Sequence, residues 1–149
     1  MRDALEVGTE VLVRGPYGRF DSAIAGKNQV GIAGGIGVTP FLSTSRAMDK
    51  GDNRNITFVY ANRNKDEALF LDDIQTQAND LRNFRVISLL SDEGNFANID
   101  VLNDTLDKAL KEYDYFMCGP KPMVDGLMKD LKKSGVQRRR IHTQAFEFR

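Results

Sequence analysis

The sequence predicts an α/β fold: a doubly wound, mainly parallel five-stranded sheet with helices on both faces, as in Rossmann-like nucleotide-binding domains. Two observations lead to this fold class. Short runs of β-branched and aromatic residues alternate along the chain with longer segments of helical periodicity. Strands that alternate with helices of this length form βαβ units, in which neighbouring strands run parallel. At 149 residues, the chain suits one such domain.

The strands are predicted by short apolar runs, of which ITFVY at 56–60 is typical of a buried strand. In chain order we expect strands at 29–32, 56–60, 84–90, 113–117 and 141–148. A further stretch near the start is VLVRGPYGRF at 11–20. It has valines at alternate positions, Val11 and Val13, followed by a Gly-Pro pair. This pattern is typical of a strand that runs into a turn.

The helices are predicted from apolar residues that recur on one face and from the residues at their ends. In chain order we expect helices at 39–50, 69–81, 101–110 and 122–133. The first has Thr39 as its expected N-cap, Pro40 as its first helical residue and Gly51 as its stop. The buried face of the second helix carries Leu71, Ile74 and Ala78, and that of the fourth carries Val124, Leu127, Met128 and Leu131.

Composition narrows the function classes. Lys and Arg total 21, and Asp and Glu total 21, so the formal net charge is zero. This balance argues against a protein whose main work is binding nucleic acid or an anionic membrane, and the basic run Arg138–Arg140 is more simply a solvated edge. The single cysteine, Cys118, excludes an internal disulfide and fits a reducing compartment. We therefore expect a cytoplasmic protein, or the cytoplasmic domain of a membrane protein.

The first glycine-rich motif is QVGIAGGIGVTPF at 29–41, in which a predicted strand ends in glycines and a predicted helix begins. Phosphate binding uses this arrangement, because glycines let the backbone approach the oxygens and a helix N-terminus offers free N–H groups and a positive dipole end. The motif lacks the Gly-Lys-Ser/Thr of a Walker loop and departs from G-x-G-x-x-G. From this segment alone, a tight turn without a ligand is an equal alternative.

The second motif, FMCGPKPM at 116–123, again joins a predicted strand to a predicted helix through a glycine and a proline. Two such crossings at strand C-terminal ends are where an open α/β sheet gathers a ligand. Cys118 sits at one of these ends, where its small, polarizable side chain suits contact with a flat ring. The alternative is that Cys118 is a buried small apolar residue. No catalytic base lies beside it in sequence, so a nucleophilic-cysteine enzyme is not expected.

Five stretches carry a resemblance to a known family: GPYGRF, AGGIGVTPF, YANRN, CGPKPM and the terminal HTQAFEFR, in this order. Together they resemble the ferredoxin–NADP reductase superfamily, and in particular its nicotinamide dinucleotide-binding domain, with the ferric-reductase-like and NADPH-oxidase-like branches nearest. The resemblance implies hydride transfer from NAD(P)H to FAD, followed by electron transfer to a haem, an iron chelate, an iron–sulfur protein or oxygen. A non-catalytic regulatory module that only binds the dinucleotide is the alternative.

The resemblance also implies a further domain. In the family, a flavin-binding barrel precedes the nucleotide-binding domain, and GPYG-like residues end its last strand. Residues 1–20 are therefore expected to be the remnant of that strand and its linker, and residues 21–149 the NAD(P)-binding domain. The implied partners are the flavin-binding domain of the same parent chain and a haem-bearing membrane domain or another electron acceptor. This chain alone is then expected to carry no flavin and to be inactive.

Site residues follow from the resemblance at matching positions. The first motif supplies Gly34, Gly35, Gly37, Val38, Thr39 and Pro40 around the pyrophosphate and the nicotinamide side, and the second supplies Cys118, Gly119, Pro120 and Met123 beside the nicotinamide. Cys118 is implied to lie near the carbon that gives up hydride. Phe146 corresponds to the aromatic residue that covers the flavin ring in the family, or Phe148 does, shifted by two positions. Gln144 stands where the family often has Glu. His142 is expected to be a structural strand residue, because one histidine alone makes no metal site.

The residues expected near the adenosine favour NADH over NADPH. NADPH-dependent relatives often place Ser-Arg after the third strand, whereas this chain has Asp92 at the position of the arginine. A carboxylate accepts hydrogen bonds from ribose hydroxyls and repels an added phosphate. Arg63 and Lys65 favour the opposite choice, since either side chain could reach a phosphate, and Asp92 is equally well a plain loop residue.

Overall fold

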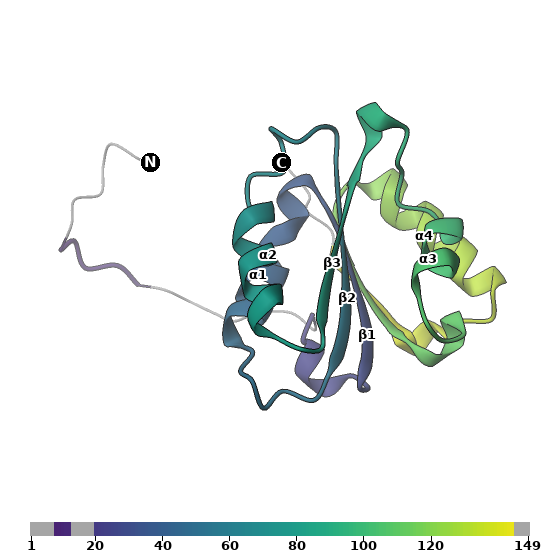
Figure 1. Ribbon diagram of the computed structural model, residues 1–149, viewed down its shortest axis with the longest axis horizontal. Coiled ribbons are helices and arrows are strands. Elements are labelled where there is room, and N and C mark those ends of the chain that lie inside the picture. The colour runs from purple at the N-terminus through teal and green to yellow at the C-terminus, as the bar shows by residue number, and fades with distance from the viewer. Residues whose placement is uncertain (1–7, 13–19, 145–149) are drawn as a thin grey trace.

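The computed structural model describes residues 8–12 and 20–144, and the described residues form a five-stranded sheet (Figure 1). Its strands are β1 (Asn28–Gly34), β2 (Asn55–Asn62), β3 (Phe84–Leu90), β4 (Asp114–Cys118) and β5 (Ile141–Gln144). Their order across the sheet is β3-β2-β1-β4-β5, and every neighbouring pair is parallel. The chain therefore starts in the middle of the sheet, builds one half, and then crosses β1 to build the other.

Helices cover both faces of this sheet (Figure 1). One face carries α1 (Thr39–Ala47) and α2 (Leu71–Asp80), and the other carries α3 (Ile99–Thr105) and α4 (Lys121–Lys133). Short 3-10 turns join several elements, namely η2 (Ser22–Ile24), η3 (Gly35–Val38), η4 (Ser91–Glu93), η5 (Leu110–Glu112) and η6 (Arg138–Arg140). The predicted doubly wound, five-stranded parallel sheet with helices on both faces is confirmed.

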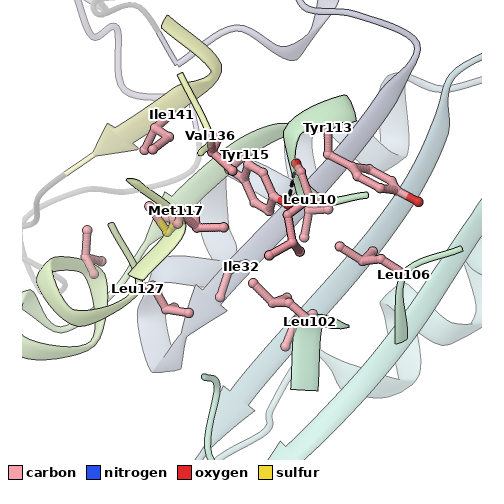
Figure 2. Close-up of a cluster of buried hydrophobic side chains, with 14 of the residues drawn as sticks. Ile32, Leu102, Leu106, Leu110, Tyr113, Tyr115, Met117, Leu127, Val136 and Ile141 are labelled. Atoms are coloured by element: carbon pink, nitrogen blue, oxygen red, sulfur yellow. Dashed lines mark hydrogen bonds between the residues drawn. The ribbon is translucent and has the colours of Figure 1, made fainter. Parts of the chain in front are cut away.

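The central strands β1 and β4 are buried on both faces, which is why apolar residues run through them. On the face of α3 and α4, Ile32 and Tyr115 are fully buried and share one core with Leu102 and Leu127 (Figure 2). The Tyr115 hydroxyl donates a hydrogen bond to the Leu110 carbonyl oxygen at 2.9 Å, which satisfies this buried polar group. Burial raises the pKa of the same phenol well above its usual value.

The opposite face is packed mainly by phenylalanine. Phe41 of α1 lies against Phe58 of β2, with ring centroids 4.9 Å apart, and Phe58 lies 6.4 Å from Phe84 of β3. Phe20, ahead of the first strand, contacts Phe41 and Phe116 edge-on, each at 5.4 Å. The aromatic core therefore extends from the sheet and α1 to the segment that precedes β1.

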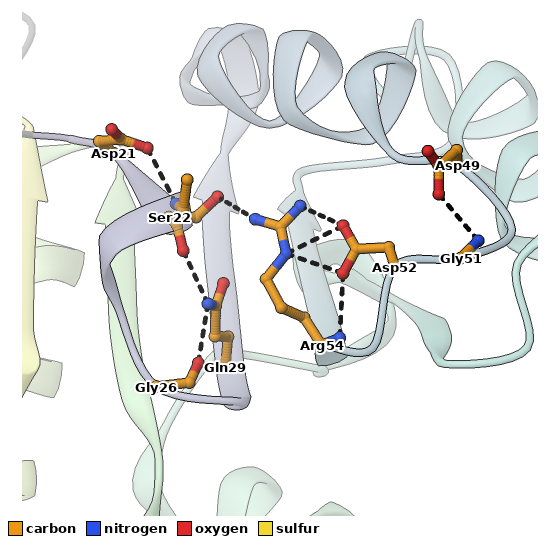
Figure 3. A network of polar contacts seen from close by, with 9 residues as sticks. Asp21, Ser22, Gly26, Gln29, Asp49, Gly51, Asp52 and Arg54 are labelled. Atoms are coloured by element: carbon orange, nitrogen blue, oxygen red, sulfur yellow. Dashed lines mark hydrogen bonds and ion pairs between the residues drawn. The ribbon is translucent and has the colours of Figure 1, made fainter.

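The loops at the amino ends of the strands are tied together by polar contacts (Figure 3). The Arg54 guanidinium donates hydrogen bonds to the Asp52 carboxylate, at 2.9 Å from Nε to Oδ1, and to the Ser22 hydroxyl at 3.0 Å. The Gln29 amide donates to the carbonyl oxygens of Ser22 and Gly26, at 2.8 and 2.9 Å. Hydrogen bonding from Arg54 lowers the pKa of Asp52. The loop before β2 is thereby fixed to the turn before β1.

Several predicted element ends are wrong. Val38, not Thr39, occupies the N-cap position of α1, because the η3 turn runs directly into the helix without an extended cap residue. Thr39 is the first helical residue, and its hydroxyl donates to the Ile36 carbonyl oxygen at 3.3 Å. The helix ends at Ala47, short of the predicted 50, and α2 begins two residues after the exposed Leu69.

The predicted helix at 101–110 is too long. α3 ends at Thr105, although Leu102, Leu106 and Leu110 have helical spacing and are all buried in the same core. Leu106 has an extended backbone instead. An irregular segment therefore buries the leucines that a helix would bury, because spacing alone does not fix the backbone between them.

The chain ends are described only in part. The strand predicted at 11–20 is wrong where it can be compared, because Val11 and Leu12 are exposed and belong to no strand, and 13–19 lie outside the described residues. The final strand is confirmed as far as Gln144, and 145–149 also lie outside. The basic run forms η6, in which Arg140 pairs with Asp114 at 3.1 Å. Within the described ranges, no helix combines the length and apolar character that a membrane span requires.

Candidate functional site

Both predicted glycine-rich motifs lie at the carboxyl edge of the sheet, and they touch each other. Ala33 of β1 pairs with Cys118 of β4, so the turns that follow the two strands leave the sheet side by side. A Cβ atom placed on Gly37 would lie 2.1 Å from the Cys118 carbonyl oxygen, and one on Gly119 would lie 2.8 Å from the Gly34 nitrogen. Only glycine permits these backbone approaches. We call the contact between Gly34, Gly37, Cys118 and Gly119 the glycine junction.

The glycine junction sits where the order of the strands reverses. The chain continues from β1 to β2 and β3 on one side, whereas β4 and β5 lie on the other. Open α/β sheets bind ligands in the crevice outside the carboxyl ends of the strands at such a point. Because η3 leads straight into α1, the first backbone N–H groups of this helix also lie at that edge, where their partial positive charge favours an anion.

A groove of about 420 Å³ opens beside the glycine junction. The carboxyl ends of β1 and β2, the loops that follow β2 and β3, and the start of α4 line it, with the residues Gly34, Gly35, Ala61, Asn62, Arg63, Glu67, Ser91, Asn95, Phe96, Ala97, Pro120 and Met123. Five residues predicted from the sequence are brought together here: Gly34, Gly35, Arg63, Pro120 and Met123.

The other residues of the predicted motifs lie around the groove rather than in its lining. Gly37 and Gly119 form the backbone contact of the glycine junction. Thr39 and Pro40 open α1 and are half-buried, whereas Val38 is fully buried in the aromatic core. These residues shape the edge on which the groove opens, and only some of them are accessible to a ligand.

Arg63 and Asp92 join the loops that follow β2 and β3. The Arg63 Nε lies 3.7 Å from Asp92 Oδ1, and the Asp92 amide donates to the Arg63 carbonyl oxygen at 2.9 Å. Both side chains are largely exposed, at 72% and 57%, so the ion pair contributes little to stability. The ion pair matters instead for ligand recognition, because the Asp92 carboxylate already faces the Arg63 guanidinium that lines the groove.

Cys118 is fully buried, in the aromatic core that also holds Phe41 and Phe116. Burial raises the pKa of the thiol to about 11, so it stays neutral at physiological pH and is a poor nucleophile. The next two residues, Gly119 and Pro120, are progressively more exposed and carry the motif towards the groove.

Of the residues predicted near the flavin, Phe146 and Phe148 lie outside the described residues. Gln144 ends β5 and is half-buried. The His142 ring stacks on Phe116, with centroids 4.5 Å apart and planes 13° apart, which fits a structural strand residue. In the described part of the chain, no cluster of three or more His, Cys, Asp or Glu side chains could hold a metal ion.

Seven of the residues that line the groove are not among the site residues predicted from the sequence, and two of these bear on binding. Phe96 is 58% exposed, and an exposed aromatic ring in a groove is suited to stacking against a flat base. A phenylalanine in the polar loop EGNFAN was a usable signal for it. Asn62 is only 7% exposed, yet neither polar atom of its carboxamide has a hydrogen-bond partner among the described residues. No sequence pattern predicts that the carboxamide of a particular asparagine will be buried without a hydrogen-bond partner.

Known proteins are similar to this chain in sequence and in fold. The family model described as "Oxidoreductase NAD-binding domain" matches residues 32–129. The NADH-cytochrome b5 reductase 1 of Pyricularia oryzae is 32% identical over 97% of this chain and 52% of its own length. The carnitine monooxygenase reductase subunit of Acinetobacter baumannii is 33% identical over 98% of this chain and 43% of its own length.

Among solved structures, the ferredoxin NADP+ reductase from Neisseria gonorrhoeae with bound FAD and NADP superimposes with a TM-score of 0.71. It is 16% identical, and the match covers 87% of this chain and 61% of that one, so this likeness concerns the fold. The chain spans about half the length of the curated relatives that it matches, 52% and 43%.

Proposed function

Because the chain belongs to the oxidoreductase NAD-binding domain family, we propose that it binds NADH across the carboxyl edge of its sheet. Together with a flavin-binding domain, it transfers hydride from the reduced nicotinamide to FAD. One observation carries this proposal: the turns after β1 and β4 meet at the glycine junction and border one groove. A dinucleotide needs such a place, where the backbone can approach a pyrophosphate closely.

In the proposed complex, charge and shape order the dinucleotide along the groove. The pyrophosphate lies over Gly34 and Gly35, where the start of α1 favours its negative charge. The nicotinamide extends towards Pro120 and Met123, and the adenosine lies towards Phe96, whose ring stacks on the base. Gly37, Val38, Thr39 and Pro40 hold the turn in the shape that this path requires.

When bound, the nicotinamide and the flavin supply the redox chemistry, as hydride donor and acceptor. The protein positions the two rings and keeps competing groups away. In this proposal Cys118 also borders the nicotinamide, which requires its side chain to become accessible in the complex, because it is fully buried in this chain. Phe146, which lies outside the described residues, is proposed as the aromatic residue that would cover the flavin ring.

The proposed preference for NADH rests on Asp92. Its carboxylate lies 3.7 Å from the Arg63 guanidinium and thereby offsets the charge that a 2′-phosphate would seek. A ribose with free hydroxyls can instead donate hydrogen bonds to Asp92. The Pyricularia oryzae relative carries an NADH-dependent name, which fits this preference.

The proposed partners are a flavin-binding domain of the same parent chain and, beyond it, an electron acceptor. We assign residues 1–20 to the connection with the flavin-binding domain and 21–149 to this one. The names of the relatives include a cytochrome reductase and a reductase subunit of a monooxygenase. We therefore propose a haem or iron–sulfur protein as the acceptor, and a cytoplasmic location, where a free Cys118 stays reduced.

Calorimetric titration of the chain with NADH tests the binding site. Phe96→Ala should weaken NADH binding about ten-fold, because it removes one stacking surface. The matched control is Leu69→Ala, since Leu69 is also exposed, at 78%, but does not line the groove. Absence of NADH and NADPH binding to the unaltered chain, or equal losses in the two variants, would overturn the proposal.

A dinucleotide sensor without catalysis is the second candidate, and the complete burial of Cys118 favours it, because the side chain is withdrawn from the groove. The two functions differ once the flavin-binding domain is present. In the two-domain parent protein, a reductase bleaches the flavin absorbance when NADH is added under anaerobic conditions. Tight NADH binding with an unchanged flavin spectrum would identify the sensor.

A further inference from the structure

One buried polar side chain at the groove has no partner. Asn62 is the last residue of β2 and only 7% exposed, and neither its Nδ2 nor its Oδ1 makes a hydrogen bond to any described residue. Folded proteins pair nearly all such atoms, because an unpaired buried amide costs free energy. An exception at the edge of a binding site therefore requires an explanation.

The neighbouring Tyr60 does not supply the missing hydrogen-bond partner. Tyr60 lies two residues earlier on the same face of β2, and a weak hydrogen-bonding interaction with the Asn62 carboxamide offsets part of the rise that burial causes in the pKa of its phenol. The distance and angles between the two side chains nevertheless do not meet those of a full hydrogen bond. Tyr60 is a neighbour of Asn62 and not its partner.

The register of the sheet places Asn62 beside the turn after β1. Gly34 pairs with Ala61, so Asn62 is level with Gly35, the first residue of η3. η3 contacts β2, and Asn62 lines the same groove as Gly34 and Gly35. The unpaired carboxamide is therefore next to the place where the proposed function puts the pyrophosphate.

We propose that Asn62 is a dinucleotide-binding residue, whose Nδ2 donates a hydrogen bond to an oxygen of the ribose–pyrophosphate segment. This inference rests on the proposed function and adds to it a residue that lies in the YANRN stretch but is not among the site residues predicted from the sequence. In the free chain both carboxamide atoms are closed off from solvent, so a side-chain rotation accompanies binding, as is common at binding sites.

The Asn62 side chain is expected to have opposite effects on the stability of the free protein and on its affinity for the dinucleotide. In the free protein the unpaired carboxamide weakens the fold, whereas in the complex it gains a partner and strengthens binding. A purely structural asparagine would stabilise the free fold, and a mere packing defect would leave binding unchanged. Stability and affinity, measured on the same variant, therefore separate these roles.

The test uses Asn62→Leu, which keeps the shape of the side chain and removes its polar atoms. We expect the melting temperature of the free chain to rise by about 3 °C, and the dissociation constant for NADH, measured by calorimetry, to increase about ten-fold. The matched control is Gln77→Leu. Gln77 Oε1 is also buried without a partner, but it lies in α2 beside Ser45 and Arg46, away from the groove. Its loss should raise the melting temperature and leave NADH binding within two-fold.

Each other result overturns the inference. A lower melting temperature for Asn62→Leu would show that the carboxamide is paired in the free protein, and unchanged NADH affinity would show that it does not reach the dinucleotide. If Asn62→Leu does not fold, Asn62→Ala supplies the affinity measurement, with the same ten-fold loss expected. Should the unaltered chain bind neither NADH nor NADPH, the proposed function fails and this inference fails with it. Binding by the unaltered chain with equal affinity in the variant overturns the inference alone.

Discussion

The amino and carboxyl edges of the sheet differ in how their polar groups are paired. At the amino edge, polar groups find partners within the chain: Arg54 binds Asp52, and the Asp114 carboxylate accepts from the Gly26 amide and from Arg140, each at 3.1 Å. At the carboxyl edge, Asn62 has no partner within the described part of the chain, the ring of Phe96 is exposed, and glycines stand where side chains would clash. The amino edge is complete by itself, whereas the carboxyl edge has unused capacity for contacts with a ligand.

This difference separates residues that hold the fold from residues that serve binding. Substitutions at the amino edge should change stability and leave dinucleotide affinity alone, because that edge is far along the strands from the groove. Substitutions at the carboxyl edge should change affinity more than stability, except where the two backbones touch.

The largest effect is expected at the glycine junction. In Gly37→Ala the new Cβ would lie 2.1 Å from the Cys118 carbonyl oxygen, so one of the two turns must move. We expect a loss of about 3 kcal/mol of stability, as for other severe steric changes, and a decrease in NADH affinity of more than about a hundred-fold, or 2.7 kcal/mol. Thermal melts and calorimetry measure both.

Gly126→Ala is the control for this substitution. Gly126 lies within α4, and nothing stands within 4 Å of its Cβ position, so alanine should stabilise the helix by about 0.5–1 kcal/mol. NADH binding should not change. A Gly37→Ala variant that binds NADH normally would show that the glycine junction has no part in the site.

Cys118→Ala should lower stability by about 1–2 kcal/mol at pH 7, because it opens a cavity in the aromatic core. The pH dependence identifies the thiol. Its folded pKa, about 11, exceeds the unfolded value, so its contribution is present below about pH 9 and is lost as the pH rises towards 11. In melts over this range, the gap between the unaltered chain and the variant should therefore narrow.

Kinetics on the two-domain parent protein decide whether Cys118 also serves the reaction. If it borders the nicotinamide, Cys118→Ala should slow flavin reduction about ten-fold in stopped-flow measurements, while NADH affinity stays the same. An unchanged reduction rate beside a depressed melting temperature would assign the thiol to the core alone.

The sequence predicted the fold well, for physical reasons that also explain its errors. β-branched and aromatic runs such as 56–60 identify buried strands, because parallel strands covered on both faces require apolar residues throughout. The ends of the helices were predicted less accurately. Leu102, Leu106 and Leu110 satisfy helical spacing, yet the chain leaves the helix at Leu106, since burial of the leucines does not require a helix between them.

The candidate site was predictable where backbone chemistry defines it. The glycine cluster at the end of the first strand indicated the edge at which Gly34 and Gly35 lie, because few side chains allow such turns, whereas Pro120 came from the family resemblance. Asn62 was not predicted because an asparagine that ends a strand is common, and only the folded structure shows that it has no partner among the described residues. Phe96 had a signal in its polar loop at 93–98, but only the folded structure shows that its ring is exposed beside the groove. Whether a side chain is hydrogen-bonded or exposed depends on residues that are distant in sequence, so it can be determined only in the folded structure.

At the amino edge, Asp52→Asn should reduce stability by about 1 kcal/mol at neutral pH and leave NADH affinity unchanged. Hydrogen bonding from Arg54 lowers the folded pKa of Asp52, so its contribution is present above the unfolded value of about 3.9 and is lost as the pH falls through the lower folded value. Acid titration by circular dichroism checks this window. Asp73→Asn is the control, because Asp73 pairs with Arg46 at 3.8 Å with both side chains 59% exposed, and it should change little. A change in NADH affinity for Asp52→Asn would contradict the division between the two edges.

The smallest effect is expected for Asp92→Asn, which tests how the carboxyl edge chooses its dinucleotide. The substitution removes the carboxylate 3.7 Å from Arg63 and so frees a guanidinium that lines the groove. NADPH affinity should rise about five-fold, with a gain that shrinks at high salt because both side chains are exposed. NADH affinity should fall by less than about two-fold, since an amide oxygen still accepts from ribose hydroxyls. Adding Arg63→Gln should abolish the gain, because the two residues act on one phosphate and their effects are therefore not additive. Calorimetric titration with NADH and with NADPH measures both affinities. If NADPH affinity still rises when Arg63 is also replaced, the ion pair does not determine the dinucleotide preference.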